Sequence, residues 1–439
     1  MRKVVRQLIP KGQEVWGWAL YDFANSAYST ALVGVIFQFY FTRFVVGPEG
    51  VDLLGRQISG PSLWGYSVSF SMALVAVTAP FLGAVADYYA SKKRFLFYAC
   101  YGGVVCTAML FLVKPGDVWL AVTFYVLSNL GLEWSIGFYN GFLPELTSPK
   151  NVGRVSGFGW ALGYVGGVAC LVLCLAIIER PNWFGLFTTD YLPVRTTFLF
   201  VAVWWGLFSI PIFCWLKERT RRDETYERIS YLKVGFRRLE LTFRKVNQLK
   251  ELVKFLIAFL IYNDGIQTVI VMATVFGATE LGMSQGELIR CFIAIHIAAF
   301  VGALGFGVMA DRWTIKSSIH SGLFVWTTAV FYVLFIHEIW EFWVLAIAVG
   351  FVLGGVQASS RALFARFTPS ASSAEFFGFF ATSGKFASIL GPALFAFITD
   401  LTGMVRAGVA SVVVFFIVGW VLFYNVDEEK GIIEARSIG

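Results

Sequence analysis

The two halves of this 439-residue chain carry matching landmarks at a nearly constant offset. The segment Gly83–Asp87 reads Gly-Ala-Val-Ala-Asp, and Gly307–Asp311, which starts 224 residues later, reads Gly-Val-Met-Ala-Asp. Thr147 and Thr368 lie 221 residues apart, and each precedes a further apolar run. Landmarks that recur in this way predict a chain built from two structurally similar halves.

Long apolar runs fill most of the sequence around these landmarks. A helix needs about 20 apolar residues to cross the hydrocarbon core of a bilayer, and twelve runs of roughly this length can be counted. Lipid offers the backbone no hydrogen-bond partners, so such runs fold as helices. Their approximate limits are 16–41, 62–86, 95–113, 118–142, 156–178, 197–216, 253–277, 288–310, 318–336, 342–363, 376–398 and 404–425.

Composition agrees with a membrane protein. Apolar residues make up 57% of the chain and charged residues 14%, whereas an ordinary soluble domain carries about 25% charged residues. We therefore expect an all-α membrane protein with twelve transmembrane helices in two pseudo-symmetric six-helix bundles, as in repeat-built transporters. The expected domains are an N-terminal bundle at 1–216, a cytoplasmic linker at 217–252 and a C-terminal bundle at 253–439. The linker pattern fits an amphipathic helix on the membrane surface and a solvated tether equally well.

The net charge of +7 follows the expected topology. Sorted by that topology, 27 of the 35 Lys and Arg residues fall on one side of the membrane and seven on the other, with Lys385 inside a helix. Basic residues concentrate on the cytoplasmic side of membrane proteins, which predicts that both termini and the linker are cytoplasmic. Segments 42–61 and 179–195 are then outside, and the basic balance indicates no nucleic-acid partner.

The sequence contains no motif for several classes of chemistry. The six cysteines fall in or beside apolar runs and form neither a disulfide framework nor a zinc pattern. There is no phosphate-binding lysine motif, so transport by this chain is not expected to use ATP. No catalytic arrangement of Ser, His and Asp is visible, and we predict neither an enzyme nor a resident metal or cofactor.

The repeated pentapeptides resemble the loop signature of the major facilitator superfamily, which is Gly-x-x-x-Asp followed by a basic residue. The second copy matches it better, because Tyr88 stands where the first copy would carry the basic residue. An Asp at such a position can accept hydrogen bonds from the start of a neighbouring helix. The resemblance implies a latch between the bundles, with Asp87 facing Glu375–Gly378 and Asp311 facing Arg154–Gly157. The gating residues would be Gly83, Asp87, Gly307, Asp311 and Arg312.

Three longer stretches resemble one branch of that superfamily, the autophagy-related vacuolar amino-acid effluxers and their bacterial relatives. They are Trp18–Ala27, Arg154–Tyr164 and Tyr262–Thr268, so the resemblance extends through the whole membrane domain. It implies a twelve-helix permease. Amino-acid export is implied less directly, because the fungal role need not extend to a shorter bacterial type of chain.

Ionisable and amide groups inside the apolar runs are the candidate solute or coupling residues, since a charge at a helix centre costs about 2.5–3.5 kcal/mol on insertion scales. In this superfamily helices 1, 4, 7 and 10 line the central cavity, and most of the candidates lie on them. For Asp22 a structural hydrogen-bonded role, and for Glu133 a structural ion pair with Lys385, remain open. Glu133 is the first choice for proton coupling and Asp22 the second. The candidates are Asp22, Asn25, Asn129, Glu133, Asn140, Asp264, Gln267, Gln357, Arg361 and Lys385.

These observations predict a secondary transporter that moves a small polar or zwitterionic solute, such as an amino acid, by alternating access. Protons are the candidate coupling ion, and the lipid bilayer is the other expected partner. We expect a monomer in a bacterial inner membrane. Two other classes remain open: a transport-silent receptor or assembly factor with the same fold, and a lipid or lysolipid flippase with a more apolar cavity.

Overall fold

The computed structural model describes residues 12–53, 56–148, 150–219, 248–369, 372–386 and 390–438. Most of these residues are helical, and one short antiparallel hairpin pairs Val51 with Ile58 and Leu53 with Arg56. Most of the expected linker, 220–247, lies outside the described residues.

The elements of the N-terminal half share a nearly all-helical character. They are α2 (Gln13–Ala27), a π-helical segment (Tyr28–Ile36), α3 (Phe37–Tyr40), a second π-helical segment (Phe41–Val45), β1 (Val51–Leu53), β2 (Arg56–Ile58), α4 (Gly60–Tyr88), α5 (Lys92–Met109), α6 (Val118–Gly141), α7 (Leu143–Leu146), α8 (Val152–Glu179), α9 (Leu192–Phe208) and α10 (Ile210–Trp215).

In the C-terminal half the described elements are all helices. They are α12 (Lys250–Thr279), α13 (Gln285–Arg312), α14 (Ile315–Tyr332), α15 (Ile339–Phe367), α16 (Ser373–Phe386), α17 (Leu390–Thr402), α18 (Val405–Ser411), α19 (Val413–Tyr424) and α20 (Glu428–Ile438). Short 3-10 turns at Leu110–Leu112, Pro181–Phe184, Thr189–Tyr191 and Val333–Phe335 join some of the helices of both halves.

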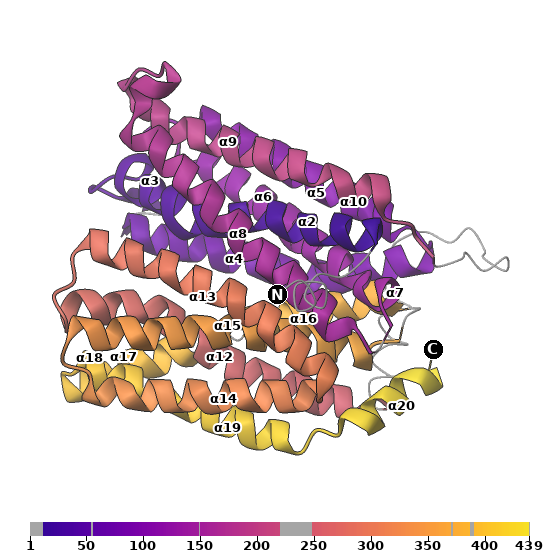
Figure 1. Ribbon diagram of the computed structural model, residues 1–439. Coiled ribbons are helices and arrows are strands. Elements are labelled where there is room, and N and C mark those ends of the chain that lie inside the picture. Colours follow the sequence, from indigo (N-terminus) through magenta and orange to yellow (C-terminus); the bar gives the residue numbers. More distant parts are fainter. Residues whose placement is uncertain are drawn as a thin grey trace.

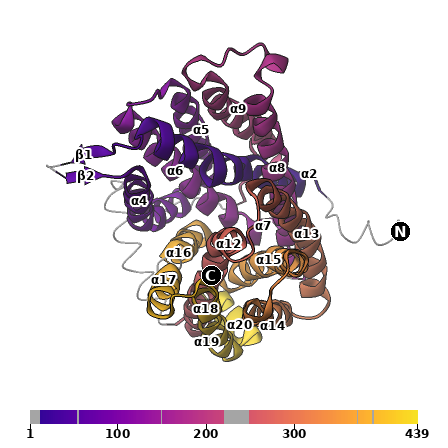
Figure 2. The same cartoon turned by 90° about the vertical axis from the view of Figure 1, so that its left-hand side faces the viewer.

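The two halves of the chain form two helical bundles that lie side by side (Figures 1 and 2). Within the N-terminal half α5 packs along α6, and within the C-terminal half α12 packs along α19. The halves meet mainly where α8 packs along α13 and α4 packs along α16, and α15 also contacts α8 and α16 contacts α6. The end of the bundles formed by α7, the start of α8, the end of α13 and the start of α16 is called the latch end below.

Nine helices in the described part of the chain are long and apolar enough to cross a membrane. Three expected runs are not among them. The run at 16–41 contains π-helical turns at Tyr28–Ile36, and in the run at 376–398 residues 387–389, between α16 and α17, lie outside the described residues. The third run is α6, a continuous helix of 24 residues that carries polar groups such as Asn129 and Glu133. The all-α membrane fold class is confirmed.

Glycines allow the bundle helices to approach one another closely. A Cβ atom built on Gly83 of α4 would lie 2.5 Å from the carbonyl oxygen of Ala374 in α16. A Cβ on Gly302 of α13 would overlap the carbonyl oxygen of Phe351 in α15. Gly102 in α5 has no atom within 4 Å of the same position. The first two positions therefore require glycine for packing, and the third does not.

We predict that Gly302→Ala lowers the apparent melting temperature of the purified protein, because the new methyl group meets backbone and one helix must move. Overpacking of this kind costs about 1–3 kcal/mol. The matched control is Gly102→Ala, which should leave the melting temperature unchanged or raise it slightly, since alanine suits a helix interior better than glycine. Equal melting temperatures for the two variants would contradict the packing of α13 against α15.

Candidate functional site

A buried ion pair joins the two halves of the chain. Arg361 lies on α15 in the C-terminal half, and its Nη1 atom donates a hydrogen bond of 2.9 Å to Oδ2 of Asp22 on α2. The Arg361 side chain is 4% exposed and that of Asp22 14%. The carboxylate is therefore the more accessible partner of the pair.

The other hydrogen bonds of the Arg361 guanidinium also reach the N-terminal half. Nη1 lies 3.3 Å from Oδ1 of Asn140 on α6. Nε donates to the hydroxyl of Ser156 on α8 at 3.0 Å, and Nη2 donates to the backbone carbonyl of Ser156 at 2.7 Å. Every nitrogen of the guanidinium thus has an oxygen partner, as a buried arginine requires.

Three aromatic rings surround the same guanidinium. Its central carbon lies 4.8 Å from the ring centroid of Trp18, 5.3 Å from that of Trp160 and 5.8 Å from that of Tyr139. Rings at these distances attract a cation through their negative faces. Trp18 is itself fixed, because its indole N–H donates to the carbonyl of Tyr139 at 2.9 Å. The surroundings of Arg361 are therefore built by α2, α6 and α8.

Asn140 and Arg361 are equivalent positions of the repeat, 221 residues apart, and they touch each other. In an arrangement with two-fold symmetry, a residue contacts its own equivalent only near the axis. The pair therefore marks the pseudo-symmetry axis between the bundles.

Asp264 on α12 has a local structural role. Both of its carboxylate oxygens accept from the backbone N–H of Gly391 at 3.0 Å, at the start of α17. Thr268 lies one turn further along α12 and is fully buried against the same position. A carboxylate at a helix N-terminus satisfies amides that have no partner within the helix. Asp264 thus joins α12 to α17.

The remaining candidates are spread over both halves. Asn129 donates to the hydroxyl of Ser71 at 2.8 Å, and Gln357 donates to Asn263 at 3.0 Å. Asn25 and Glu133 are buried in the N-terminal half, and Gln267 is half-buried on α12. The side chain of Lys385 lies outside the described part of the structure, so the suggested ion pair with Glu133 stays a prediction.

Asp311 lies at the latch end, at the contact between α13 and α8. Its carboxylate accepts from the backbone N–H groups of Gly153 and Arg154, at 3.0 and 3.1 Å. Arg154 adds its side chain, with Nε 3.5 Å from Oδ2 of Asp311. Gly307 lets the two helices meet, because a Cβ there would lie 2.9 Å from the carbonyl oxygen of Gly153. The contact expected between Asp311 and the start of the run near Arg154–Gly157 is present, and Arg312 beside it is exposed.

Asp87 makes the equivalent contact on the other side of the latch end. Its carboxylate accepts from the backbone N–H of Glu375 at 2.9 Å, at the start of α16. Glu375 occupies the repeat position of Arg154, so this contact brings a second carboxylate instead of a cation. The positive charge comes from Lys92, whose ammonium lies 3.9 Å from Asp87.

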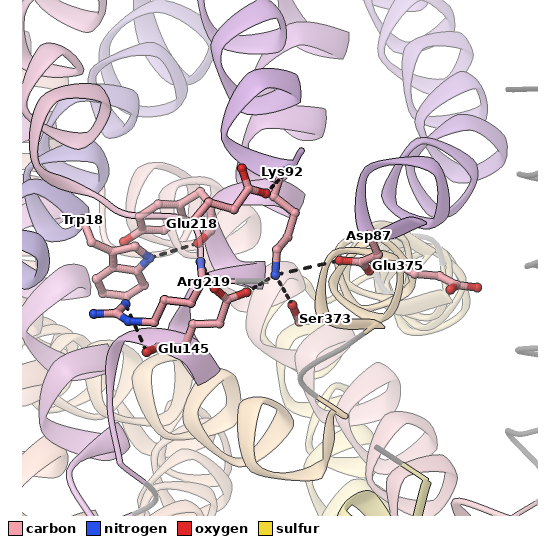
Figure 3. Close-up of polar contacts among 9 residues, drawn as sticks. Trp18, Asp87, Lys92, Glu145, Glu218, Arg219, Ser373 and Glu375 are labelled. Atoms are coloured by element: carbon pink, nitrogen blue, oxygen red, sulfur yellow. Dashed lines mark hydrogen bonds and ion pairs between the residues drawn. The ribbon is translucent and has the colours of Figure 1, made fainter. Parts of the chain in front are cut away.

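Lys92 connects several segments at the latch end (Figure 3). Its side chain is fully buried, pairs with Glu145 and donates to the hydroxyl of Ser373 at 2.9 Å. The Lys92 backbone N–H donates to Glu218, which follows α10. Burial raises the pKa of the Glu218 carboxyl, and the Lys92 N–H acts in the opposite direction. Lys92 therefore ties both halves and the start of the linker together.

The sequence suggested some of these contacts and missed others. It placed Asp87 and Asp311 against the correct helix starts, because the repeated pentapeptides resemble a loop signature that implies a latch between the bundles. It did not predict the pairing of Arg361 with Asp22, since neither residue follows a motif that indicates its partner. Ser156 and Glu145 were not selected either, although both lie in short segments beside the landmarks. Within the described residues, no three His, Cys, Asp or Glu side chains are grouped as a metal site would require.

Comparison with known proteins gives consistent matches along the whole chain. A family model described as "Vacuole effluxer Atg22 like" matches residues 11–436. The MFS-type transporter YxiO of Bacillus subtilis (strain 168), itself described as uncharacterized, is 33% identical over 414 residues, which cover 94% of each chain. Autophagy-related protein 22-1 of Penicillium rubens is 24% identical over 89% of this chain and 79% of its own length.

Solved structures show the same fold at low identity. The proton:xylose symporter XylE matches with a TM-score of 0.70 and 12% identity, over 97% of this chain and 98% of XylE. The human organic anion transporter MFSD10 also gives a TM-score of 0.70 and 12% identity, over 94% of this chain and 99% of its own. These likenesses establish the major facilitator fold.

We predict that the double variant Asp87→Asn/Asp311→Asn opens the latch end. Each carboxylate that accepts backbone N–H bonds contributes about 1.5–3 kcal/mol as a charged acceptor. The amide oxygen of Asn can still accept a weaker bond, so the ratio of closed to open molecules should fall about tenfold or more. The measurement is the distance between spin labels on Lys150→Cys and Glu429→Cys, one in each half, in a Cys214→Ser background. The control is Asp190→Asn, which removes an exposed ion pair with Lys114 away from the latch end. An unchanged distance distribution in the double variant would remove the gating role.

Proposed function

We propose that this chain, which belongs to the Atg22-like vacuole effluxer family, is a secondary transporter that moves a small polar or zwitterionic solute by alternating access. It is a major facilitator superfamily protein, and an amino acid is the leading candidate for its solute. The observation that carries the proposal is the buried Arg361–Asp22 pair between the halves, because opposite charges at such an interface suit a solute that carries both signs.

Alternating access needs contacts that can close one end of the molecule and then release. The reciprocal contacts of Asp87 with Glu375 and of Asp311 with Gly153 and Arg154 have this character. Each joins one half to a helix start in the other half, so a relative rotation of the bundles breaks both together. These contacts support a cycle in which the conformation of this structure is the one that is closed at the latch end.

The charge distribution supports a cytoplasmic location of the latch end, in a bacterial inner membrane. Under this proposal Lys150 faces the cytoplasm, and Trp183, which is 76% exposed, faces the other side. In intact cells expressing a Cys214→Ser background, a membrane-impermeant maleimide should label Trp183→Cys and leave Lys150→Cys unlabelled. After the cells are opened, Lys150→Cys should be labelled too. Labelling of Lys150→Cys in intact cells would reverse the topology.

A solute screen tests the transport proposal itself. Purified protein is tested for thermal stabilisation by amino acids, short peptides, nucleosides and sugars, since a ligand that binds only the folded state raises apparent stability. Any stabilising solute is then offered to proteoliposomes, where net uptake or counterflow is expected. Stabilisation without transport would favour a receptor, and movement of labelled lysolipid between leaflets without solute uptake would favour a flippase.

Glu133 is proposed as the proton-coupling residue. It lies on α6 and is 3% exposed, and a carboxylate that alternates between water and a desolvated site is suited to bind and release a proton. We expect Glu133→Gln to abolish transport driven by a pH gradient while solute counterflow survives, because counterflow needs no net proton movement. Glu179→Gln, on an exposed residue at the end of α8, should keep both activities. Full pH-driven transport by Glu133→Gln would assign Glu133 a structural role.

A further inference from the structure

Arg361 is a residue of one half whose guanidinium has all its hydrogen-bond partners in the other half. Its four hydrogen bonds end on Asp22, Asn140 and Ser156, which lie on α2, α6 and α8. The aromatic rings around it come from the same three helices. Its side chain therefore bridges the interface that alternating access has to rearrange.

Separation of the halves at the latch end poses an electrostatic problem for this side chain. A guanidinium stays charged at every physiological pH, and breaking a buried pair by removing one partner is strongly destabilising. Rotation of the bundles would withdraw Arg361 from its acceptors on the N-terminal half together. In the other state of the cycle the guanidinium therefore lacks the counter-charge of Asp22, and an anion bound there would replace it.

We propose that Arg361 binds the carboxylate of the transported solute, and that Asp22 is the internal carboxylate that occupies it in the present state. The proposal rests on the transport function proposed above and adds the chemical group of the solute that is recognised. In the cycle, the solute carboxylate and Asp22 compete for one guanidinium. The solute thus supplies the counter-charge that lets the halves separate.

The local geometry suits such an exchange. A guanidinium presents a planar fork that matches a carboxylate, and here the rings of Trp18 and Trp160 hold it in place without using its N–H donors. Gly159 leaves room for the pair, because a Cβ there would lie 2.8 Å from both Arg361 Nη2 and Asp22 Oδ2. Asp22 is also the more exposed member, so an incoming anion reaches its side of the pair more easily.

Acetate serves as a probe of the exchange, since it is a carboxylate small enough to replace the Asp22 side chain. In Asp22→Ala the guanidinium loses its counter-charge, and the apparent melting temperature should fall. Sodium acetate should then restore part of the loss in a saturable way, by a few degrees, where sodium chloride of equal ionic strength does not. The double variant Asp22→Ala/Arg361→Gln should show no difference between the two salts, and the wild-type protein should show a smaller one than Asp22→Ala.

If Asp22→Ala cannot be purified in a folded form, Asp22→Asn keeps the shape of the side chain and removes its charge, and the same acetate-specific stabilisation is expected. Equal effects of acetate and chloride in the folded variant, or an acetate effect that survives Arg361→Gln, would overturn the proposal. This outcome is independent of transport, so it separates failure of the carboxylate site from failure of the proposed function.

A second arm uses the solute that the screen identifies. An amino acid and the amine that lacks its carboxylate are compared for binding to the wild-type protein, Arg361→Lys and Arg361→Gln. We expect the amino acid to bind about 100-fold more weakly to Arg361→Gln, with Arg361→Lys between, while the amine binds all three alike and weakly. An amine that binds the wild-type protein as tightly as the amino acid would overturn the proposal even if transport is confirmed.

Discussion

Backbone N–H groups at helix starts need partners, and in this protein carboxylates repeatedly supply them. The first amides of a helix have no acceptor within the helix, and where a helix start is buried against another helix no water replaces it. Asp87, Asp311 and Asp264 each accept from the start of another helix. At the latch end Glu218 and Glu428 do the same for the starts of α5 and α14. The arrangement of the helices depends on these charge-assisted bonds, which also fix where the two halves meet.

The buried aspartates of the two latches each have a positive charge beside them, and different residues supply it. Arg154 brings a cation to Asp311 from the helix that Asp311 caps. Its repeat equivalent is Glu375, an acid, and on that side Lys92 from the N-terminal half supplies the cation instead. Glu145 then pairs with Lys92, whereas its repeat equivalent, Arg366, pairs with Glu428 of α20. The fold therefore keeps the carboxylate–amide bond in both latches and varies the source of the counter-charge.

The sequence predicted the parts of this structure that repeat or span the bilayer. Apolar runs indicate helices because lipid offers the backbone no hydrogen-bond partner. The resemblance of Gly83–Asp87 and Gly307–Asp311 to a known loop signature implies which helix starts the two aspartates reach. The π-helical turns at Tyr28–Ile36 were not predicted, since they lie within a continuous apolar run. The partner of Arg361 was not predicted either, because a buried charge takes whichever acceptor the packed bundles bring near it, and spacing along the chain does not encode that choice.

The contact between Asn140 and Arg361 has a consequence for how far the two repeats can resemble each other. Off the axis, both copies of a position can keep the same residue, as Asp87 and Asp311 do. On the axis a residue faces its own copy, so identical arginines would repel each other and identical acids would do the same. One copy must then be neutral or of opposite charge, as the amide of Asn140 is to Arg361. The axis between the halves is thus the place where an exact internal duplication could not have kept a charge, and where the halves had to become different.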